Sequence, residues 1–186
     1  MKRLLVTSVL LAVIVFSAYS QGDGEGDAGL GDITLEGYSR ATDENMGFDF
    51  QWKVEGEELH VQMAAVTTGW IALGFDPTKM MAGANIIIGY VSDGSVFLSD
   101  DYGSGQVKHS PDEELGGEEH LSRIDGEEEN GATRIRFTIP LNSGDSYDKP
   151  LVPGNTYKVI YAYGPNGSDD FGSYHSRKRG SFEITL

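Results

Sequence analysis

Strict alternation of apolar and polar side chains, repeated in short stretches, is the feature that most limits the possible folds. In residues 48–54 the apolar members are Phe48, Phe50, Trp52 and Val54, and polar residues lie between them. The same period of two recurs in residues 59–65, 133–141, 157–163 and 182–186. A period of two places alternate side chains on opposite faces of a strand, whereas a helix needs a period near 3.6. These segments therefore predict β-strands that each bury one face.

The connections between these stretches are rich in turn residues. Residues 55–58, EGEE, separate the first two predicted strands and indicate a hairpin, and residues 93–94 and 164–167 mark further turns. Pro140 indicates the end or the edge of its strand, because proline has no N–H for a ladder. No stretch after residue 20 has a convincing helical pattern. The sequence therefore predicts an all-β fold, an antiparallel immunoglobulin-like β-sandwich.

The first 20 residues have a different composition. Lys2 and Arg3 precede an apolar run, and Ala-Tyr-Ser at the end of the segment offers a small-residue cleavage site. The run is short for a membrane span, so we expect residues 1–20 to be a signal peptide, with an uncleaved membrane anchor as the alternative. Residues 21–31, QGDGEGDAGLG, predict a flexible acidic linker, and residues 32–186 predict one folded domain. This domain is expected outside the cytoplasm, periplasmic or secreted.

Charge and cysteine content exclude several classes of protein. The net charge of the chain is −15, and removal of the leader takes away two basic residues and no acid, which makes it −17. Such a surface excludes nucleic acid as a partner and favours calcium association or a partner with a basic patch. The chain has no cysteine, so disulfides, thiolate metal sites and covalent haem attachment are excluded.

Residues 69–91, GWIALGFDPTKMMAGANIIIGYV, contain two apolar runs joined by a loop with adjacent methionines. Residues 70–75 predict one strand, which an Asp-Pro pair ends, and residues 84–91 predict the next. Met80 and Met81 therefore lie at a strand end, beside a glycine that lets the backbone approach a ligand closely. Methionine sulfur is a soft ligand that suits iron or copper(I).

These residues resemble the DOMON family. The resemblance is carried by Trp-hydrophobic-Ala-hydrophobic-Gly-Phe at 70–75, Met-x-Gly-Ala-Asn at 81–85 and a Tyr-His pair at 174–175, and it covers residues 32–186. The family includes the cytochrome domain of cellobiose dehydrogenase and modules of copper monooxygenases. In its haem-binding branch, one methionine of this loop and one late histidine ligate the iron. The resemblance thus implies Met81 and His175 as metal ligands, with Met80 one position out of register.

The resemblance also implies a cofactor and a role. Non-covalent haem b with both axial positions filled by protein would transfer single electrons, and the thioether would raise its potential. Apolar walls are expected from Trp70, Phe75, Ile86, Ile88, Tyr163, Phe171 and Tyr174. Haem propionates are expected at the basic residues Arg177, Lys178 and Arg179. Since the predicted ligands lie at strand ends, we expect the site among the sandwich loops. We expect a monomer whose redox partner is a separate protein.

Two other functions fit the same sequence. Family members are also thought to bind sugars, and in a sugar- or small-ligand-binding module exposed tyrosines and Trp52 could stack on pyranose rings, with Met81 packed in the core. A structural or adhesive domain is the third hypothesis. The sequence shows no nucleophile elbow, paired carboxylates or histidine-rich metal motif. We therefore do not expect an enzyme, and any catalysis would lie in a partner protein.

The middle of the chain gives weaker signals. Asp100 and Asp101 could bind calcium through oxygen, but they lack the alternating spacing of an EF-hand loop, so a solvated turn is the preferred interpretation. Residues 103–131 carry glycines and clustered glutamates and are the least ordered region by composition. His109 and His120 have no partner at metal-ligand spacing and are interpreted as surface residues.

Overall fold

The computed structural model of the chain describes residues 29–31, 33–175 and 178–186. The predicted signal peptide, residues 21–28 of the predicted linker, and Arg177 lie outside the described residues. Within the described residues, no helix has the length and apolar character that crossing a bilayer requires.

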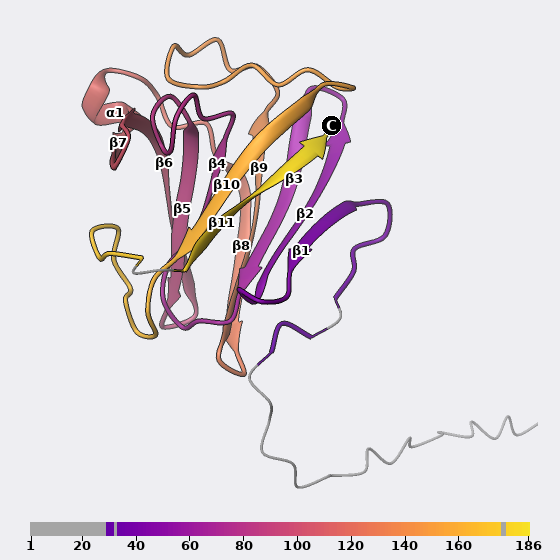
Figure 1. The fold of residues 1–186 in the computed structure, drawn as a ribbon, viewed down its shortest axis with the longest axis vertical. Helices are drawn as coiled ribbons and strands as arrows, with labels where there is room; N and C mark the ends of the chain where they lie inside the picture. The colour runs from indigo at the N-terminus through magenta and orange to yellow at the C-terminus, as the bar shows by residue number, and fades with distance from the viewer. Residues whose placement is uncertain (1–28, 32, 176–177) are drawn as a thin grey trace, which may run out of the picture.

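The described strands form two antiparallel sheets that pack face to face (Figure 1). In order across the five-stranded sheet these are β1 (Ser39–Asp43), β2 (Phe48–Glu55), β3 (Glu58–Ala65), β9 (Ala132–Pro140) and β8 (Ser122–Glu129). In order across the six-stranded sheet these are β11 (Arg179–Thr185), β10 (Thr156–Tyr163), β4 (Ile71–Phe75), β5 (Asn85–Ser92), β6 (Ser95–Gly105) and β7 (Lys108–Pro111). A short helix, α1 (Asp112–Leu115), follows β7. The prediction of an antiparallel β-sandwich is confirmed.

The core lies between the two sheets and is built by the alternating apolar residues. Phe48 of β2 stacks on Tyr161 of β10, with ring centroids 4.3 Å apart, and so joins the two sheets. Phe50 meets Phe75 of β4 edge to face at 6.2 Å. Offset and edge-to-face aromatic pairs of this kind add to the free energy that burial alone supplies. The predicted strand pattern is therefore correct for the inner faces.

Trp52 belongs to this core and is only 7% exposed. Its indole Nε1 donates a hydrogen bond to the carbonyl oxygen of Thr185, 3.3 Å away. The expectation that Trp52 stacks on a sugar is therefore wrong, because its ring lies inside the sandwich.

The outer face of the five-stranded sheet is polar. Asp49 accepts a hydrogen bond from Arg40 Nε at 2.5 Å, and Gln51 Nε2 donates to the carbonyl oxygen of Ile33 at 2.6 Å. Arg134 Nη2 donates to the carbonyl oxygen of Leu30, so the carboxyl end of the predicted linker lies against this sheet. Hydrogen bonds thus satisfy the polar residues that alternate with the core.

The middle of the chain is ordered, contrary to the prediction from composition. Residues 108–111 and 122–129 form β7 and β8, which pair with β6 and β9. Asp100 and Asp101 lie within β6 and are buried, so the interpretation as a solvated turn is also wrong. Glycine and glutamate were read as signs of a loop, but backbone pairing on an existing strand outweighs such weak local preferences.

Candidate functional site

A cavity of about 330 Å³ lies on the outer face of the six-stranded sheet. Its floor is formed by outward-facing residues of β4, β5 and β10, namely Ala72, Gly74, Ile86, Ile88, Ile160 and Ala162. The small alanine side chains leave room above the sheet, and the isoleucines supply apolar walls. Gly74 has no space for a side chain, since a Cβ there would lie 2.8 Å from Ile160 Cγ1. The site was expected among the sandwich loops; a sheet face forms the floor of the cavity, and two loops close its sides.

One side of the cavity is closed by the loop between β4 and β5, which we call the methionine loop (residues 76–84). Thr78 holds the loop in a tight turn, since its backbone N–H and its Oγ1 both donate to the carbonyl oxygen of Ala82, at 2.9 and 2.8 Å. Met81 N donates to the carbonyl oxygen of Gln106, in the turn between β6 and β7. Met81 is half-buried and Met80 is 52% exposed, and both line the cavity.

Gly103 of β6 allows the methionine loop to lie where it does. A Cβ at this position would be 1.7 Å from the carbonyl oxygen of Met81, a distance that no side chain can occupy. Backbone hydrogen bonds join the two segments directly, from Gly83 N to Gly103 O and from Gly103 N to Ala84 O, each at 2.8 Å. The position of Met81 thus depends on a glycine in a strand that is distant in the sequence.

The opposite side of the cavity is closed by described residues between β10 and β11, which we call the histidine loop (residues 164–175 and 178). Its base is held by the start of β4, because Gly164 N donates to Trp70 O and Trp70 N donates to Ser168 O. Within the loop, Asp170 Oδ1 accepts hydrogen bonds from the backbone N–H groups of Gly172 and Ser173. Ser173 Oγ bonds the other carboxylate oxygen, and this hydrogen bond is the main cause of the lowered pKa of Asp170.

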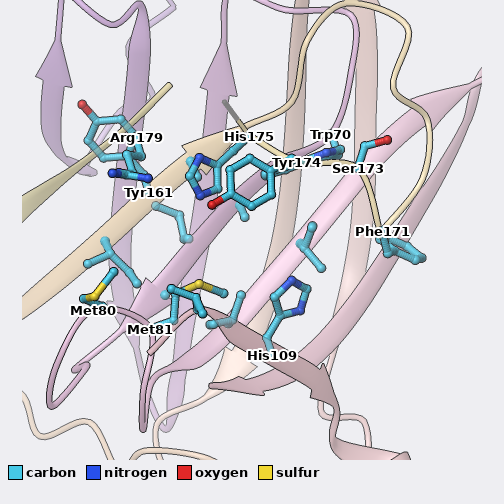
Figure 2. Close-up of a pocket in the computed structure, with 18 of the residues that line it drawn as sticks. Trp70, Met80, Met81, His109, Tyr161, Phe171, Ser173, Tyr174, His175 and Arg179 are labelled. Carbon is cyan, nitrogen blue, oxygen red and sulfur yellow. The ribbon is translucent and has the colours of Figure 1, made fainter. Parts of the chain in front are cut away.

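His175 is half-buried and lies between two aromatic rings. Tyr174 stacks on it at 4.9 Å, and Trp70 meets it edge to face at 6.4 Å. In the view of Figure 2, His175 and Met81 approach the cavity from opposite sides, each from its own loop. The structure thus brings the two predicted ligands to one cavity, although they are far apart in the sequence.

A third possible ligand, His109 of β7, also lines the cavity (Figure 2). Its Nδ1 lies 2.5 Å from Asp101 Oδ2, and Asp101 Oδ1 accepts a hydrogen bond from Ser99. The carboxylate orients the imidazole and favours a proton on Nδ1. The interpretation of His109 as a surface residue without a partner is wrong. No sequence spacing indicates its role, because the pairing of β6 with β7 creates the contact.

Two predicted wall residues, Phe75 and Tyr163, lie elsewhere. Both side chains face the core between the sheets. Tyr163 donates its hydroxyl hydrogen to the carbonyl oxygen of Met46, on the five-stranded side. The period of two explains the difference, since the neighbours Gly74 and Ala162 are the residues that face outward. Of the other predicted wall residues, Trp70, Ile86, Ile88, Phe171 and Tyr174 line the cavity.

The predicted basic residues are divided between the cavity and its surroundings. Arg179, the first residue of β11, is exposed and lines the cavity. Lys178 does not line it, and its Nζ lies 5.7 Å from the centroid of the Tyr163 ring. Tyr161 also lines the cavity, and its hydroxyl donates to Asp43 Oδ2 at 2.5 Å. Burial, together with this bond, raises the pKa of Tyr161, so the phenol stays protonated.

Comparison with known proteins decides the family. The DOMON domain model matches residues 44–164, which include the cavity floor and the methionine loop. The chain belongs to the DOMON family. The resemblance seen in the sequence is therefore confirmed.

This DOMON chain is similar to parts of longer proteins. DBH-like monooxygenase protein 2 of Mus musculus is 27% identical over 183 residues, which are 95% of this chain and 28% of that protein. DBH-like monooxygenase protein 1 of Mus musculus is 32% identical over 136 residues, which are 73% of this chain and 21% of that protein. The chain thus spans less than a third of the length of these relatives.

Two solved structures share the DOMON fold. The cytochrome b domain of pyranose dehydrogenase from Coprinopsis cinerea matches with a TM-score of 0.60 and 14% identity, over 80% of this chain and 81% of that one. The cytochrome domain of cellobiose dehydrogenase from Myriococcum thermophilum matches with a TM-score of 0.54 and 10% identity, over 82% of this chain and 90% of that one. At these identities the likeness shows the fold alone.

Proposed function

We propose that this chain is a non-covalent b-type haem domain that transfers single electrons, with Met81 and His175 as axial ligands. The main support is that a thioether and an imidazole from two different loops line the same apolar cavity. Neither residue is needed there for the sandwich core, which lies on the other face of the sheet. The cytochrome b domains of similar fold add to this support.

The cavity has the chemistry that a haem needs. Its floor is aliphatic, and Trp70, Phe171 and Tyr174 add aromatic surface at the histidine loop. Its volume of about 330 Å³ falls within the range of ligand pockets, roughly 300–1,000 Å³. The lining also includes polar groups, His109 and Ser173 among them. The residues present therefore fit the group.

Each part of the site has a definite role in this proposal. Haem held by a methionine and a histidine exchanges one electron at a time and leaves no coordination position for oxygen or substrate. Met81 is positioned by its backbone hydrogen bond to Gln106, and His175 by the rings of Trp70 and Tyr174. Arg179, at the exposed edge, is suited to pair with a propionate. The isoleucines of the floor exclude water.

The partner and the compartment follow from charge and from the leader. We propose an extracytoplasmic domain, on the basis of residues 1–20, and a separate redox protein as partner. A net charge of −15 would attract a partner with a basic patch and make the encounter slower at high salt. The activity of the longer relatives is not needed for this role, since electron transfer requires only the haem domain.

The test is an absorption spectrum of the protein, expressed with haem supplied, before and after reduction with dithionite. A sharp, split α band that carbon monoxide does not shift is expected, because both axial positions are filled. A colourless protein that also fails to take up added haemin would contradict the proposal and favour a sugar- or small-ligand-binding DOMON module.

Four variants identify the ligands. His175→Ala is expected to lose most of the haem, and Met81→Ala to keep haem with altered axial ligation. Met80→Ala is the matched control, since it removes a neighbouring thioether and should leave the spectrum unchanged. His109→Ala tests whether His109, and not Met81, is the second ligand of the iron. If His109→Ala changes the spectrum and Met81→Ala does not, Met81 is not the ligand.

A further inference from the structure

A second cluster of polar side chains lies on the other face of the strands that form the cavity floor. Asp100 and Asp101 are adjacent in β6, so their side chains point to opposite faces of the sheet. Asp101 contacts His109 on the cavity side, whereas Asp100 points toward His120 and Asp148. One ligand atom from each of Asp100, His120 and Asp148 lies within 4.8 Å of the others. The interpretation of His120 as a surface residue without a partner is therefore wrong.

This cluster contains buried oxygen atoms without hydrogen-bond partners. Asp112 is 1% exposed, and among the described residues neither of its carboxylate oxygens has a partner. The same holds for one side-chain oxygen each of Asn85 and Asp100, whereas Asp148 Oδ2 has His120 Nδ1 at 3.2 Å. An unpaired buried carboxylate costs several kcal/mol, so such groups are normally paired with a cation. Four buried oxygen atoms without a hydrogen-bond partner, on neighbouring side chains, indicate a missing positive charge.

The described lysines and arginines do not pair with these carboxylates, because their ion pairs lie elsewhere. The basic group beside the cluster is the imidazole of His120, whose Nδ1 lies 3.2 Å from Asp148 Oδ2. The backbone N–H of His120 donates a hydrogen bond to Asp100 Oδ2 at 3.0 Å. Among the described residues, one imidazole is therefore the basic group that faces three carboxylates.

The donor set favours calcium. Calcium takes six to eight oxygen ligands, and carboxylate and amide oxygens are those it commonly uses in proteins. Asp100, Asp112 and Asp148 supply carboxylates, and Asn85, whose Nδ2 donates to Asp148 Oδ1 at 2.5 Å, presents its Oδ1 as well. The one nitrogen, His120 Nδ1, lies 3.2 Å from Asp148 Oδ2 and can donate to it. Three negative charges in one buried site suit a divalent cation.

We propose that Asn85, Asp100, Asp112 and Asp148 form a calcium site at the end of the sandwich, behind the cavity floor. The site joins four segments that are distant in the sequence. These are β5, β6, the start of α1 and the loop between β9 and β10, which passes α1 at one end of the molecule in Figure 1. Its role is structural, and it does not depend on the proposal for haem.

Contacts around the site show which part of the chain a cation would hold in place. Tyr147 donates its hydroxyl hydrogen to the carbonyl oxygen of Leu115 in α1, and the Glu118 N–H donates to Asp145. Tyr147 also packs edge to face on Tyr102 of β6, with centroids 5.4 Å apart. The loop after β9 thus already rests on α1 and β6. A cation among the three carboxylates would convert their mutual repulsion into attraction.

The test is a calcium titration of the EDTA-treated protein by isothermal titration calorimetry, together with thermal unfolding in calcium and in EDTA. The wild type is expected to bind one calcium per chain and to melt at a higher temperature in calcium, because a ligand that binds only the folded state stabilises it. Asp112→Asn is expected to bind at least about tenfold more weakly, since affinity follows the charge of the ligands. Glu113→Gln removes an equal charge from the exposed neighbouring position and is expected to bind as the wild type does.

Thermal unfolding in EDTA shows whether Asp112→Asn weakens calcium binding by removing a ligand or by destabilising the fold. Without calcium, Asp112→Asn is expected to be at least as stable as the wild type, because it removes one of the repelling carboxylates. Equal calcium affinity of the Asp112→Asn and Glu113→Gln variants would overturn the proposal, and so would the absence of saturable binding. Parallel titrations with zinc and manganese test the cation, and tighter binding of either would overturn the assignment to calcium, because it would point to His120 as a principal ligand.

Discussion

The two sheets of the sandwich share one core, but their outer faces differ. The five-stranded sheet has a polar outer face, where Asp49, Gln51 and Gln62 form hydrogen bonds. The six-stranded sheet has an apolar outer face, formed by the residues of the cavity floor. A strand that faces water on one side needs only one apolar face, whereas β4 and β5 are apolar on both. The second apolar face is explained if a ligand covers it.

The difference between the core face and the cavity face of the six-stranded sheet can be tested most strongly within β5. Adjacent isoleucines of this strand face opposite ways. Ile87 is 0% exposed in the core, and Ile88 is 2% exposed on the cavity side. Ile87→Ala is expected to lower the free energy of unfolding by about 2–5 kcal/mol, the usual loss for a packed isoleucine. Ile88→Ala is expected to cost less, because its side chain already borders a cavity, and to weaken haemin uptake. Urea unfolding of both variants measures the difference.

An equal loss of stability in the two variants would mean that the outer face is as tightly packed as the core. In that case the cavity would not be a preformed ligand site. The Ile87→Ala protein, if folded, is expected to keep its haem spectrum, which provides the internal control.

The next effect concerns the strand that supports the methionine loop. Gly103→Ala would place a Cβ 1.7 Å from the carbonyl oxygen of Met81, so this loop must move. We expect a loss of about 1–3 kcal/mol, as for other overpacked sites, and altered axial ligation. Hydrogen exchange at the Gly83 amide, which bonds Gly103 O, reports the movement directly.

Gly105→Ala is the matched control for this change. The nearest atom to a Cβ at Gly105 is Lys108 Cβ at 3.7 Å, an ordinary contact. This variant is expected to keep both the spectrum and the protection of the Gly83 amide. If Gly103→Ala behaves in the same way, Gly103 does not position Met81.

The smallest change in the free energy of unfolding is expected for a substitution that places a large side chain from the floor into the cavity. Ala72→Phe adds a ring on the outer face, and the free energy of unfolding is expected to stay within about 1 kcal/mol of the parent, since the ring enters a cavity. Haemin uptake, followed by the absorption spectrum, is expected to be lost. Ala72→Ser keeps the size of the residue and should keep uptake. Unchanged uptake by Ala72→Phe would place the ligand elsewhere.

The local alternation of apolar and polar residues was sufficient to predict most of the fold. Strands β2, β3, β9, β10 and β11 follow the period of two, and the hairpin of β2 and β3 forms at the predicted turn. The same pattern also carried an error, since Phe75 and Tyr163 were assigned to the cavity although their phase places them in the core. In a strand that is apolar on both faces, the period alone does not tell which face is inside.

The residues of the two candidate sites differ in how far the sequence revealed them. Met81 and His175 were found through resemblance to a family, not through spacing. Asp100 was considered as a calcium ligand but interpreted as part of a solvated turn, and Asp112 and Asp148 were missed, because an aspartate among other acidic residues reads as a solvated charge. Only the structure shows that these side chains are close together and that partners are lacking for them among the described residues.

By itself, the sequence determined the β-sandwich, the inner faces of its strands and the acidic charge, since these depend on residue type and on neighbours one or two positions away. The tertiary structure decided that the cavity lies on a sheet face, that His109 joins it, and that the buried Asp100 and Asp112 gather with the half-buried Asp148 behind its floor. The physical reason is that strand pairing joins positions far apart in the chain. A side chain's burial and charge environment come from the strands beside it, and no local pattern records them.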